Sequence, residues 1–292
     1  MDRKIEADLL LRDSDYLDED FELVEGKSIL IKDGRIEGID TAESLKEKYT
    51  WREELDGSGC VYMPGLVDSH MHTGQQLLRG RILDEMPMIW TRVMLPYEST
   101  LTPEKMGLSA RMAAVEMIHA GTTGFIDAGS YFMEEAADVY ARSGLRGALS
   151  YSTMDQEGLP ASIAMDARTA VRKTDELYKE FHGQENIKVY YSLRSLISCS
   201  EDLILMAAER AAGNHTMLQA HMNEYPGEIN FYMERKQLRP YEYLDRLGVL
   251  GPDFLGAHSL LLSESEISLL EERGVKVCHC PFSNCGKAAP RT

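Results

Sequence analysis

Residues 63–72 read Met-Pro-Gly-Leu-Val-Asp-Ser-His-Met-His. The apolar Leu66 and Val67 are typical of the buried end of a strand, and two histidines follow one residue apart. Because alternate residues of a strand face the same way, His70 and His72 are expected to point to one side. Two imidazoles converging at a strand end indicate a transition-metal site, and the alternative is an incidental pair.

From residue 61 onward, apolar strand-like runs alternate with helical stretches. Further strands are predicted at residues 123–127, 146–150, 188–192, 217–221, 254–258 and 275–280. Strands that alternate with helices predict a parallel sheet. Candidate ligands follow several different strands, which favours a (β/α)8 barrel over a doubly wound sheet.

Helices are predicted between the strands. Helices are predicted over residues 162–181 and 201–212. Another should begin after Thr102, because threonine is a common N-cap and Pro103 suits the first helical position. Its apolar face would be formed by Leu108, Met112, Val115 and Ile118.

The first part of the chain has a different pattern. Residues 1–62 contain short strand-like runs, and Asp33-Gly34 is typical of a hairpin turn. We therefore expect a small β module over 1–62, part of a composite β-sandwich, followed by the barrel over 63–292.

Composition narrows the class of protein. The 292 residues carry a net charge of −17, which argues against nucleic acid as a partner because phosphate binding needs a basic face. Neither a signal peptide nor a run of membrane-spanning length is evident, so we expect a cytoplasmic protein. The five cysteines are odd in number and are expected to be reduced, with Cys278 and Cys280 in the interior.

Three further residues extend the histidine pair. His221 and His258 each end a predicted strand, and Glu224 follows His221 by three residues. Neutral imidazoles hold Zn²⁺ or Fe²⁺ and leave a position for water, whose pKa falls towards ~7. Glu224 could carry a proton from that water to a leaving group, and the alternative is a solvated acid at a helix start. Spacing leaves open whether His258 is a ligand or a neighbouring group that orients the water.

These motifs together resemble the amidohydrolase superfamily, and within it the branch of cytosine/guanine deaminases and triazine chlorohydrolases. Residues 64–72 are similar to the first-strand signature of that superfamily. Further matches are Leu77-Leu78-Arg79-Gly80, Gly121-Thr122-Thr123, His221-x-x-Glu224, Ala257-His258 and Cys280-Pro281-x-Ser283-Asn284. Homodimers are common in this group.

The resemblance implies roles for particular residues. It implies that His70, His72 and His221 bind one divalent metal ion, Zn²⁺ or alternatively Fe²⁺. Glu224 would be the proton shuttle, and His258 would polarise the hydrolytic water. The binuclear relatives have a lysine at the end of the fourth strand, which this chain lacks there, so a mononuclear site is expected.

The resemblance also points to a substrate class. Gln75 and Arg194 are similar to residues of guanine-type deaminases that contact a planar heterocycle, and Trp90 is a candidate pocket wall. The structural alternatives are that Arg194 pairs with a buried acid and that Gln75 caps a loop. The function implied is hydrolytic deamination of an amino-substituted N-heterocycle, with guanine-type substrates favoured. The alternatives are a triazine-type chlorohydrolase or aminohydrolase, and a non-catalytic scaffold.

One element of the superfamily site is not found in the sequence. The superfamily completes its site with an aspartate at the end of the eighth strand, whereas this sequence stops at Thr292 after the seventh predicted strand. The acids after His258 fall in one helical stretch. We therefore expect this chain to be part of a longer polypeptide, and the alternative is an inactive truncated product.

Overall fold

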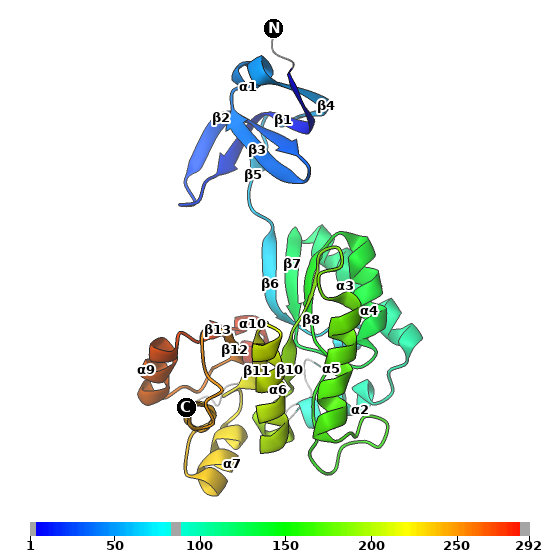
Figure 1. Ribbon diagram of the computed structural model, residues 1–292, viewed down its shortest axis with the longest axis vertical. Coiled ribbons are helices and arrows are strands. Elements are labelled where there is room, and N and C mark those ends of the chain that lie inside the picture. The colour runs from blue at the N-terminus through cyan, green and yellow to red at the C-terminus, as the bar shows by residue number, and fades with distance from the viewer. Residues whose placement is uncertain (1–3, 83–88, 287–292) are drawn as a thin grey trace. The chain divides into compact units, whose positions relative to one another are not determined.

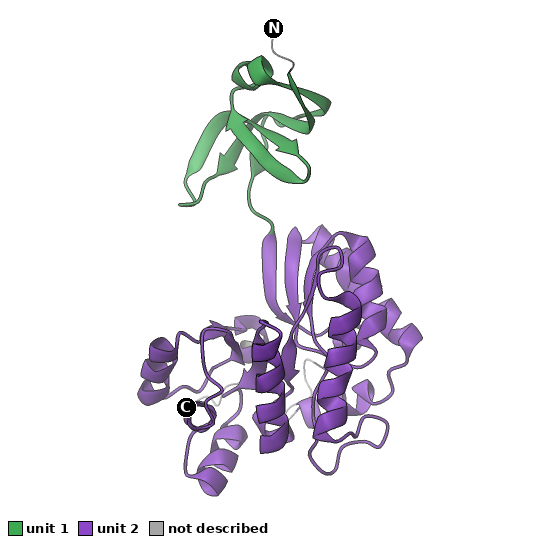
Figure 2. Cartoon of the chain, viewed as in Figure 1, with its two compact units in different colours: residues 1–65 green, residues 66–292 purple. Residues whose placement is uncertain are grey.

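The computed structural model describes residues 4–82 and 89–286. The chain divides into two compact units, Met1–Gly65 and Leu66–Thr292 (Figure 2). None of the helices in the described part of the chain is long and apolar enough to cross a membrane.

The first unit is a small β-sheet. It consists of β1 (Ile5–Leu17), β2 (Leu23–Lys32), β3 (Arg35–Asp40), α1 (Ala42–Lys48), β4 (Tyr49–Asp56) and β5 (Val61–Tyr62). The strand order is β3-β2-β1-β4, and β5 also pairs with β1. Its core is formed by Ala7, Leu10, Leu30 and Leu45.

The predicted hairpin turn is confirmed. β2 and β3 are antiparallel with Lys32 opposite Arg35, which leaves Asp33 and Gly34 as the two-residue turn. Both turn residues have positive φ, 51° and 71°, as a type I′ turn requires.

The second unit alternates strands and helices (Figure 1). Its first half contains β6 (Leu66–Met71), η1 (Thr73–Leu78), η2 (Trp90–Met94), α2 (Leu95–Glu98), α3 (Pro103–His119), β7 (Thr122–Asp127), α4 (Met133–Ser143), β8 (Arg146–Leu149), α5 (Ala167–Phe181) and β9 (Ile187–Val189). Its second half contains β10 (Tyr191–Leu193), η3 (Leu196–Ser198), α6 (Glu201–Gly213), β11 (Leu218–Met222), α7 (Pro226–Lys236), α8 (Pro240–Arg246), β12 (Phe254–His258), α9 (Glu264–Arg273), β13 (Lys276–Cys278) and α10 (Pro281–Gly286).

The strands of this unit form two parallel sheets in chain order. One sheet runs β6-β7-β8-β9 and the other β10-β11-β12-β13. The predicted strand at 188–192 is broken at Tyr190, whose backbone N–H bonds Leu149, whereas that of Tyr191 bonds Met217. The chain therefore passes from one sheet to the next at Tyr190, between β9 and β10. Within each sheet all the strands are parallel.

Besides the broken strand at 188–192, two predicted elements differ from the structure in their boundaries. The helix predicted over 162–181 begins only at Ala167, because the Asp166 side chain accepts the Thr169 N–H and caps it there. The strand predicted over 275–280 is shorter, Lys276–Cys278, and α10 follows at Pro281.

The start of α3 is confirmed, but the prediction of its apolar face is wrong. The Thr102 hydroxyl accepts the Lys105 N–H, and Pro103 occupies the first turn. The predicted face is exposed, at 40–57% for Leu108, Met112, Val115 and Ile118. The face that packs inward carries Met106, Ala110, Ala113, Ala114 and Met117. Apolar residues lie on both faces of α3, so periodicity alone does not select the face that packs inward.

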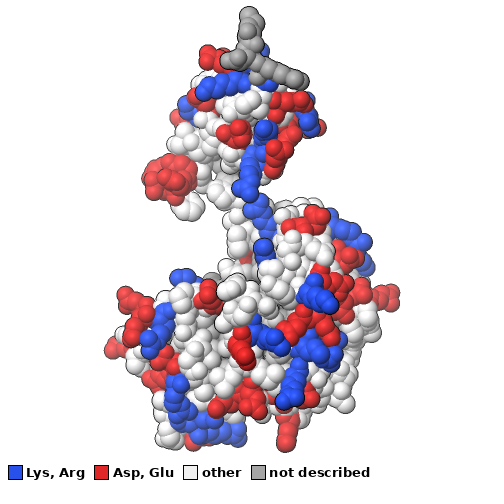
Figure 3. All heavy atoms as spheres, viewed as in Figure 1, with Lys and Arg blue, Asp and Glu red and all other residues white. Residues whose placement is uncertain are grey.

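Charged side chains are mixed over the drawn surface. On the face in Figure 3, Lys and Arg are interspersed with Asp and Glu on both units. Such a distribution gives no concentrated basic patch on this face, in keeping with the net charge of −17.

Candidate active site

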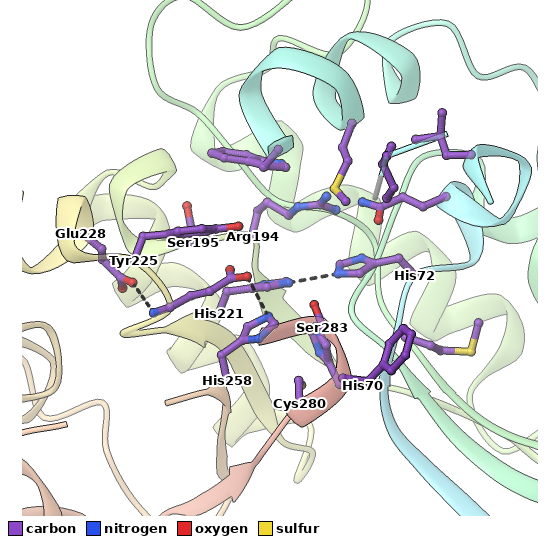
Figure 4. A pocket seen from close by; sticks show the side chains of 18 of the residues that line it. His70, His72, Arg194, Ser195, His221, Tyr225, Glu228, His258, Cys280 and Ser283 are labelled. Atoms are coloured by element: carbon purple, nitrogen blue, oxygen red, sulfur yellow. Dashed lines mark hydrogen bonds and ion pairs between the residues drawn. The ribbon is translucent and has the colours of Figure 1, made fainter. Parts of the chain in front are cut away.

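Four histidine side chains meet at the carboxyl ends of three strands (Figure 4). His70 lies in β6 and His72 directly after it, while His221 lies in β11 and His258 ends β12. The centre of the His70 ring is 5.0 Å from that of His72, 4.7 Å from that of His221 and 5.0 Å from that of His258. The fold thus gathers histidines from three segments that are far apart in the sequence.

The imidazole nitrogens are close enough to share one ion. His72 Nε2 lies 3.0 Å from His221 Nε2, and one nitrogen each of His70, His221 and His258 lies within 4.8 Å of the others. Two imidazoles on a tetrahedral zinc ion, with Zn–N about 2.0–2.1 Å, hold their nitrogens about 3.3 Å apart. The nitrogens of His70, His221 and His258 therefore lie at a spacing that fits a divalent metal ion, and His72 of the predicted set contacts this group through His221.

The protonation state of His221 suits metal binding. Burial, followed by the neighbouring His70, His72 and His258, holds the pKa of His221 well below its usual range. His221 is therefore a neutral imidazole at physiological pH, which is the form that binds a metal ion.

A buried hydrogen-bonded pair supports the His70 ring. Gln219 Nε2 lies 3.1 Å from His70 Nδ1, and Gln219 Oε1 accepts the Tyr190 hydroxyl at 2.7 Å. Both Gln219 and Tyr190 are 1% exposed. Such a buried contact restricts the orientation of the His70 ring.

Replacing Gln219 with Leu should therefore lower the zinc affinity about 10-fold, because the His70 ring loses its fixed orientation. The measurement is a zinc titration against a competing chelator. The matched control is Gln184→Leu, since the Gln184 side chain is exposed and bonds only a helix carbonyl. Equal zinc affinities for the two variants would show that Gln219 does not support the cluster.

Glu224 lies in the turn after β11, beside the histidines. Its Oε1 is 3.6 Å from His258 Nε2, and its side chain is 11% exposed. Burial, together with the neighbouring Glu224 carboxylate, raises the pKa of the adjacent Tyr225 hydroxyl, so that hydroxyl stays protonated near neutral pH. The position of Glu224 allows it to exchange a proton with a group bound next to His258.

A second carboxyl lies next to Glu224. Glu228 is 5% exposed, and its Oε2 accepts the Glu224 backbone N–H at 3.2 Å. Burial raises the pKa of Glu228 to about 8, and the negative charges of Glu224 and Glu266 add to that shift. Glu228 is therefore largely protonated at neutral pH.

This shift predicts a pH-dependent effect of Glu228→Gln on stability. Between about pH 4.5 and 8, Glu228 is protonated in the folded state and ionised in the unfolded state. The free energy of unfolding of the wild type therefore falls as pH rises through this range. Glutamine does not titrate, so the variant should match the wild type at pH 5 and exceed it at pH 8.5, by up to about 4 kcal/mol. Denaturant unfolding at both pH values measures the difference. A constant difference would contradict the prediction.

The predicted substrate contacts Gln75 and Arg194 meet at an acid that sequence reasoning missed. Glu98 Oε1 accepts Gln75 Nε2 at 3.0 Å and Arg194 Nη2 at 3.1 Å. Arg194 is 3% exposed and Glu98 is 1% exposed. The guanidinium of Arg194 also lies 6.0 Å from the centre of the Trp90 ring. The structural alternative for Arg194, pairing with a buried acid, is therefore what the structure contains.

Breaking this pair should be costly. Glu98→Gln leaves the Arg194 guanidinium buried without a counter-charge, and the free energy of unfolding should fall by about 3 kcal/mol. The double variant Glu98→Gln/Arg194→Met, which removes the buried charge, should regain a large part of this loss. Urea unfolding of both variants measures the two values. A double variant less stable than Glu98→Gln would contradict the explanation.

These residues surround one pocket of about 760 Å³. Its wall includes the four histidines, Gln75, Arg194, Glu224 and Glu228, with Trp90, Met94 and Ile197 as apolar lining. Cys280 also lines it, so the expectation that this thiol packs in the interior is wrong. A pocket of this size and mixed lining suits a small organic ligand of nucleoside size.

Three polar residues of the site were missed from the sequence. Gln219 is two residues before His221 on the same strand, and the alternate-residue rule could have placed both on one side. Glu228 follows Glu224 by one helical turn, near the start of a helix that begins at a proline. Glu98 carries no such local signal, because its partner Arg194 lies 96 residues further along.

The fold and the histidine cluster together describe a parallel α/β protein whose site fits a divalent metal ion. The chain belongs to the Amidohydrolase family, whose profile matches residues 61–287. Among proteins of similar sequence is a 5'-deoxyadenosine deaminase from Methanopyrus kandleri, 35% identical over 268 residues, which cover 90% of this chain and 60% of the relative.

Solved structures share the fold. An adenosine deaminase from Xanthomonas campestris with bound zinc superposes with a TM-score of 0.90 at 24% identity, covering 98% of this chain and 65% of that one. The atrazine chlorohydrolase TrzN from Arthrobacter aurescens TC1, complexed with zinc, gives a TM-score of 0.86 at 19% identity, covering 96% and 67%. The chain thus spans about three fifths of the length of the curated relative.

Proposed function

We propose that this protein is a metal-dependent hydrolytic deaminase of an amino-substituted purine ring. The observation that carries the proposal is the meeting of four histidine side chains with Glu224 in one pocket. The same arrangement supports the (β/α)8 barrel expected from the sequence, in which the strands of the two parallel sheets would be consecutive members.

The proposed metal ligands are His70, His72 and His221, with Zn²⁺ as the ion and Fe²⁺ as the alternative. When bound, the ion supplies the Lewis acidity that makes water nucleophilic near neutral pH. An all-nitrogen donor set of neutral imidazoles suits either ion.

The chain's own residues move the protons. Glu224 accepts a proton from the attacking water as its oxygen bonds to the amino-bearing ring carbon, and delivers a proton to the amino nitrogen. The carbon–nitrogen bond then breaks and ammonia leaves. His258, whose Nε2 lies 3.6 Å from Glu224 Oε1, orients the attacking oxygen through a hydrogen bond at Nε2.

Adenine-type and guanine-type substrates differ in the polar groups at the edge of the purine ring, which side chains of the pocket would contact. Gln75 Nε2 and Arg194 Nη2, one donor atom of each candidate substrate contact, are bonded to Glu98. This contact, together with the name of the Methanopyrus relative, favours an adenine nucleoside over the guanine-type base expected from the sequence. Trp90 and the apolar residues beside it would cover the face of the ring.

The test is ammonia release by the zinc-loaded protein. We expect ammonia from adenosine or 5'-deoxyadenosine, and less from guanine, cytosine or a pterin. Chloride release from atrazine would favour the chlorohydrolase alternative, and no ammonia from any compound would overturn the proposal. Fewer than about 0.2 equivalents of zinc or iron after gentle purification would favour a non-catalytic scaffold.

A further inference from the structure

The turn that carries Glu224 is fixed on its first side by Asn223. Asn223 is fully buried and has a positive φ of 49°, a conformation that asparagine tolerates better than most residues. Its Nδ2 lies 3.0 Å from each carboxylate oxygen of Glu266, and its carbonyl accepts the Leu261 N–H at 3.0 Å. The residue before Glu224 is therefore anchored to α9 and to the loop after β12.

Glu228 lies on the other side of Glu224. It is the third residue of α7, and its Oε2 accepts the Glu224 N–H at 3.2 Å. The dashed line that ends at the Glu228 carboxyl in Figure 4 marks this contact. Its Oε1 is buried and has no hydrogen-bond partner among residues 4–82 and 89–286.

This contact differs from ordinary helix capping. In a capping box the third helical residue accepts the N–H of the N-cap residue itself. Two neighbouring helices follow that rule: Glu242 of α8 accepts the N–H of its N-cap Arg239 at 2.9 Å, and Glu266 of α9 accepts that of its N-cap Ser263 at 3.1 Å. In α7 the N-cap is Tyr225, yet Glu228 bonds the residue before it, Glu224.

The displaced contact determines where the Glu224 side chain can reach. The backbone at Glu224 is held between the Asn223 anchor and Glu228, and from there its Oε1 lies 3.6 Å from His258 Nε2. Because Glu228 is largely protonated at neutral pH, it holds this backbone without adding a second negative charge beside Glu224.

We propose that Glu228 is a positioning residue for Glu224, which fixes the Glu224 backbone so that its carboxylate stays beside His258. The inference rests on the proposed role of Glu224 in proton transfer. It assigns to Glu228 no contact with the reacting atoms.

The test compares Glu228→Ala with Glu228→Gln. Glutamine retains an oxygen that can accept the Glu224 N–H, whereas alanine does not. Asp166→Ala is the matched control, because it removes an exposed carboxylate that accepts a helix-start N–H at 2.7 Å on the distant α5. The first readout is hydrogen exchange of the Glu224 amide, resolved within a peptide spanning residues 220–230. The second is the steady-state kinetics of ammonia release.

We expect Glu228→Ala to speed exchange of the Glu224 amide about 10-fold and to lower kcat about 10- to 100-fold with KM nearly unchanged. Glu228→Gln and Asp166→Ala should stay close to the wild type in both readouts. Unchanged exchange in Glu228→Ala overturns the inference, as does a raised KM with an unchanged kcat. A wild-type chain that releases no ammonia counts against the proposed function, and the exchange comparison then decides this inference alone.

Discussion

Replacing Glu224 with Gln should lower kcat for ammonia release by about 10²- to 10⁴-fold. Glutamine keeps the size of the side chain beside His258 but cannot accept a proton from water or return one to the leaving amine. Zinc content and folding should be unchanged, because the proposed metal ligands are histidines and Glu224 is not one of them. Steady-state kinetics and metal analysis of the purified variant measure both quantities.

The matched control for this variant is Glu234→Gln, an exposed glutamate on the neighbouring α7. It should keep wild-type kinetics. If Glu224→Gln kept more than about a tenth of the wild-type kcat, Glu224 would not be the proton shuttle, and the mechanism proposed for deamination would be wrong.

Replacing His221 with Ala should abolish stoichiometric zinc binding and, with it, ammonia release. His221 is central to the cluster, since its ring lies 4.7 Å from that of His70 and its Nε2 lies 3.0 Å from His72 Nε2. Loss of one of three protein ligands leaves a donor set too small for a stable zinc site. Metal content after dialysis is the direct measurement.

Thermal unfolding supplies an independent readout for the same variant. A ligand that binds only the folded state raises its stability by about 2.7 kcal/mol at 100 times its Kd, so added zinc should raise the Tm of the wild type. His221→Ala should show no such rise, and His119→Ala, at the exposed end of α3, should respond like the wild type. A zinc-dependent Tm in His221→Ala would show that the cluster is not the metal site.

The local parts of the fold could be read from the sequence because they depend on neighbouring residues. The Asp33-Gly34 hairpin and the Thr102-Pro103 helix start follow from backbone preferences of two or three residues. Periodicity gave the position of α3 but not its orientation. Apolar residues lie on both faces of this helix, and packing against the rest of the unit decides which face is buried.

By itself, the sequence determined at which end of the sheet the candidate metal-binding histidines lie. The two-residue period of β6 and the positions of His221 and His258 at strand ends placed imidazoles on the carboxyl side of a parallel sheet. Only the tertiary structure decided which groups touch. The contacts of His72 with His221 and of His70 with Gln219 each join residues 149 positions apart. Backbone preferences act over a few residues, whereas such distances depend on how whole strands and helices pack, so Glu98 could be assigned to the site only in the folded chain.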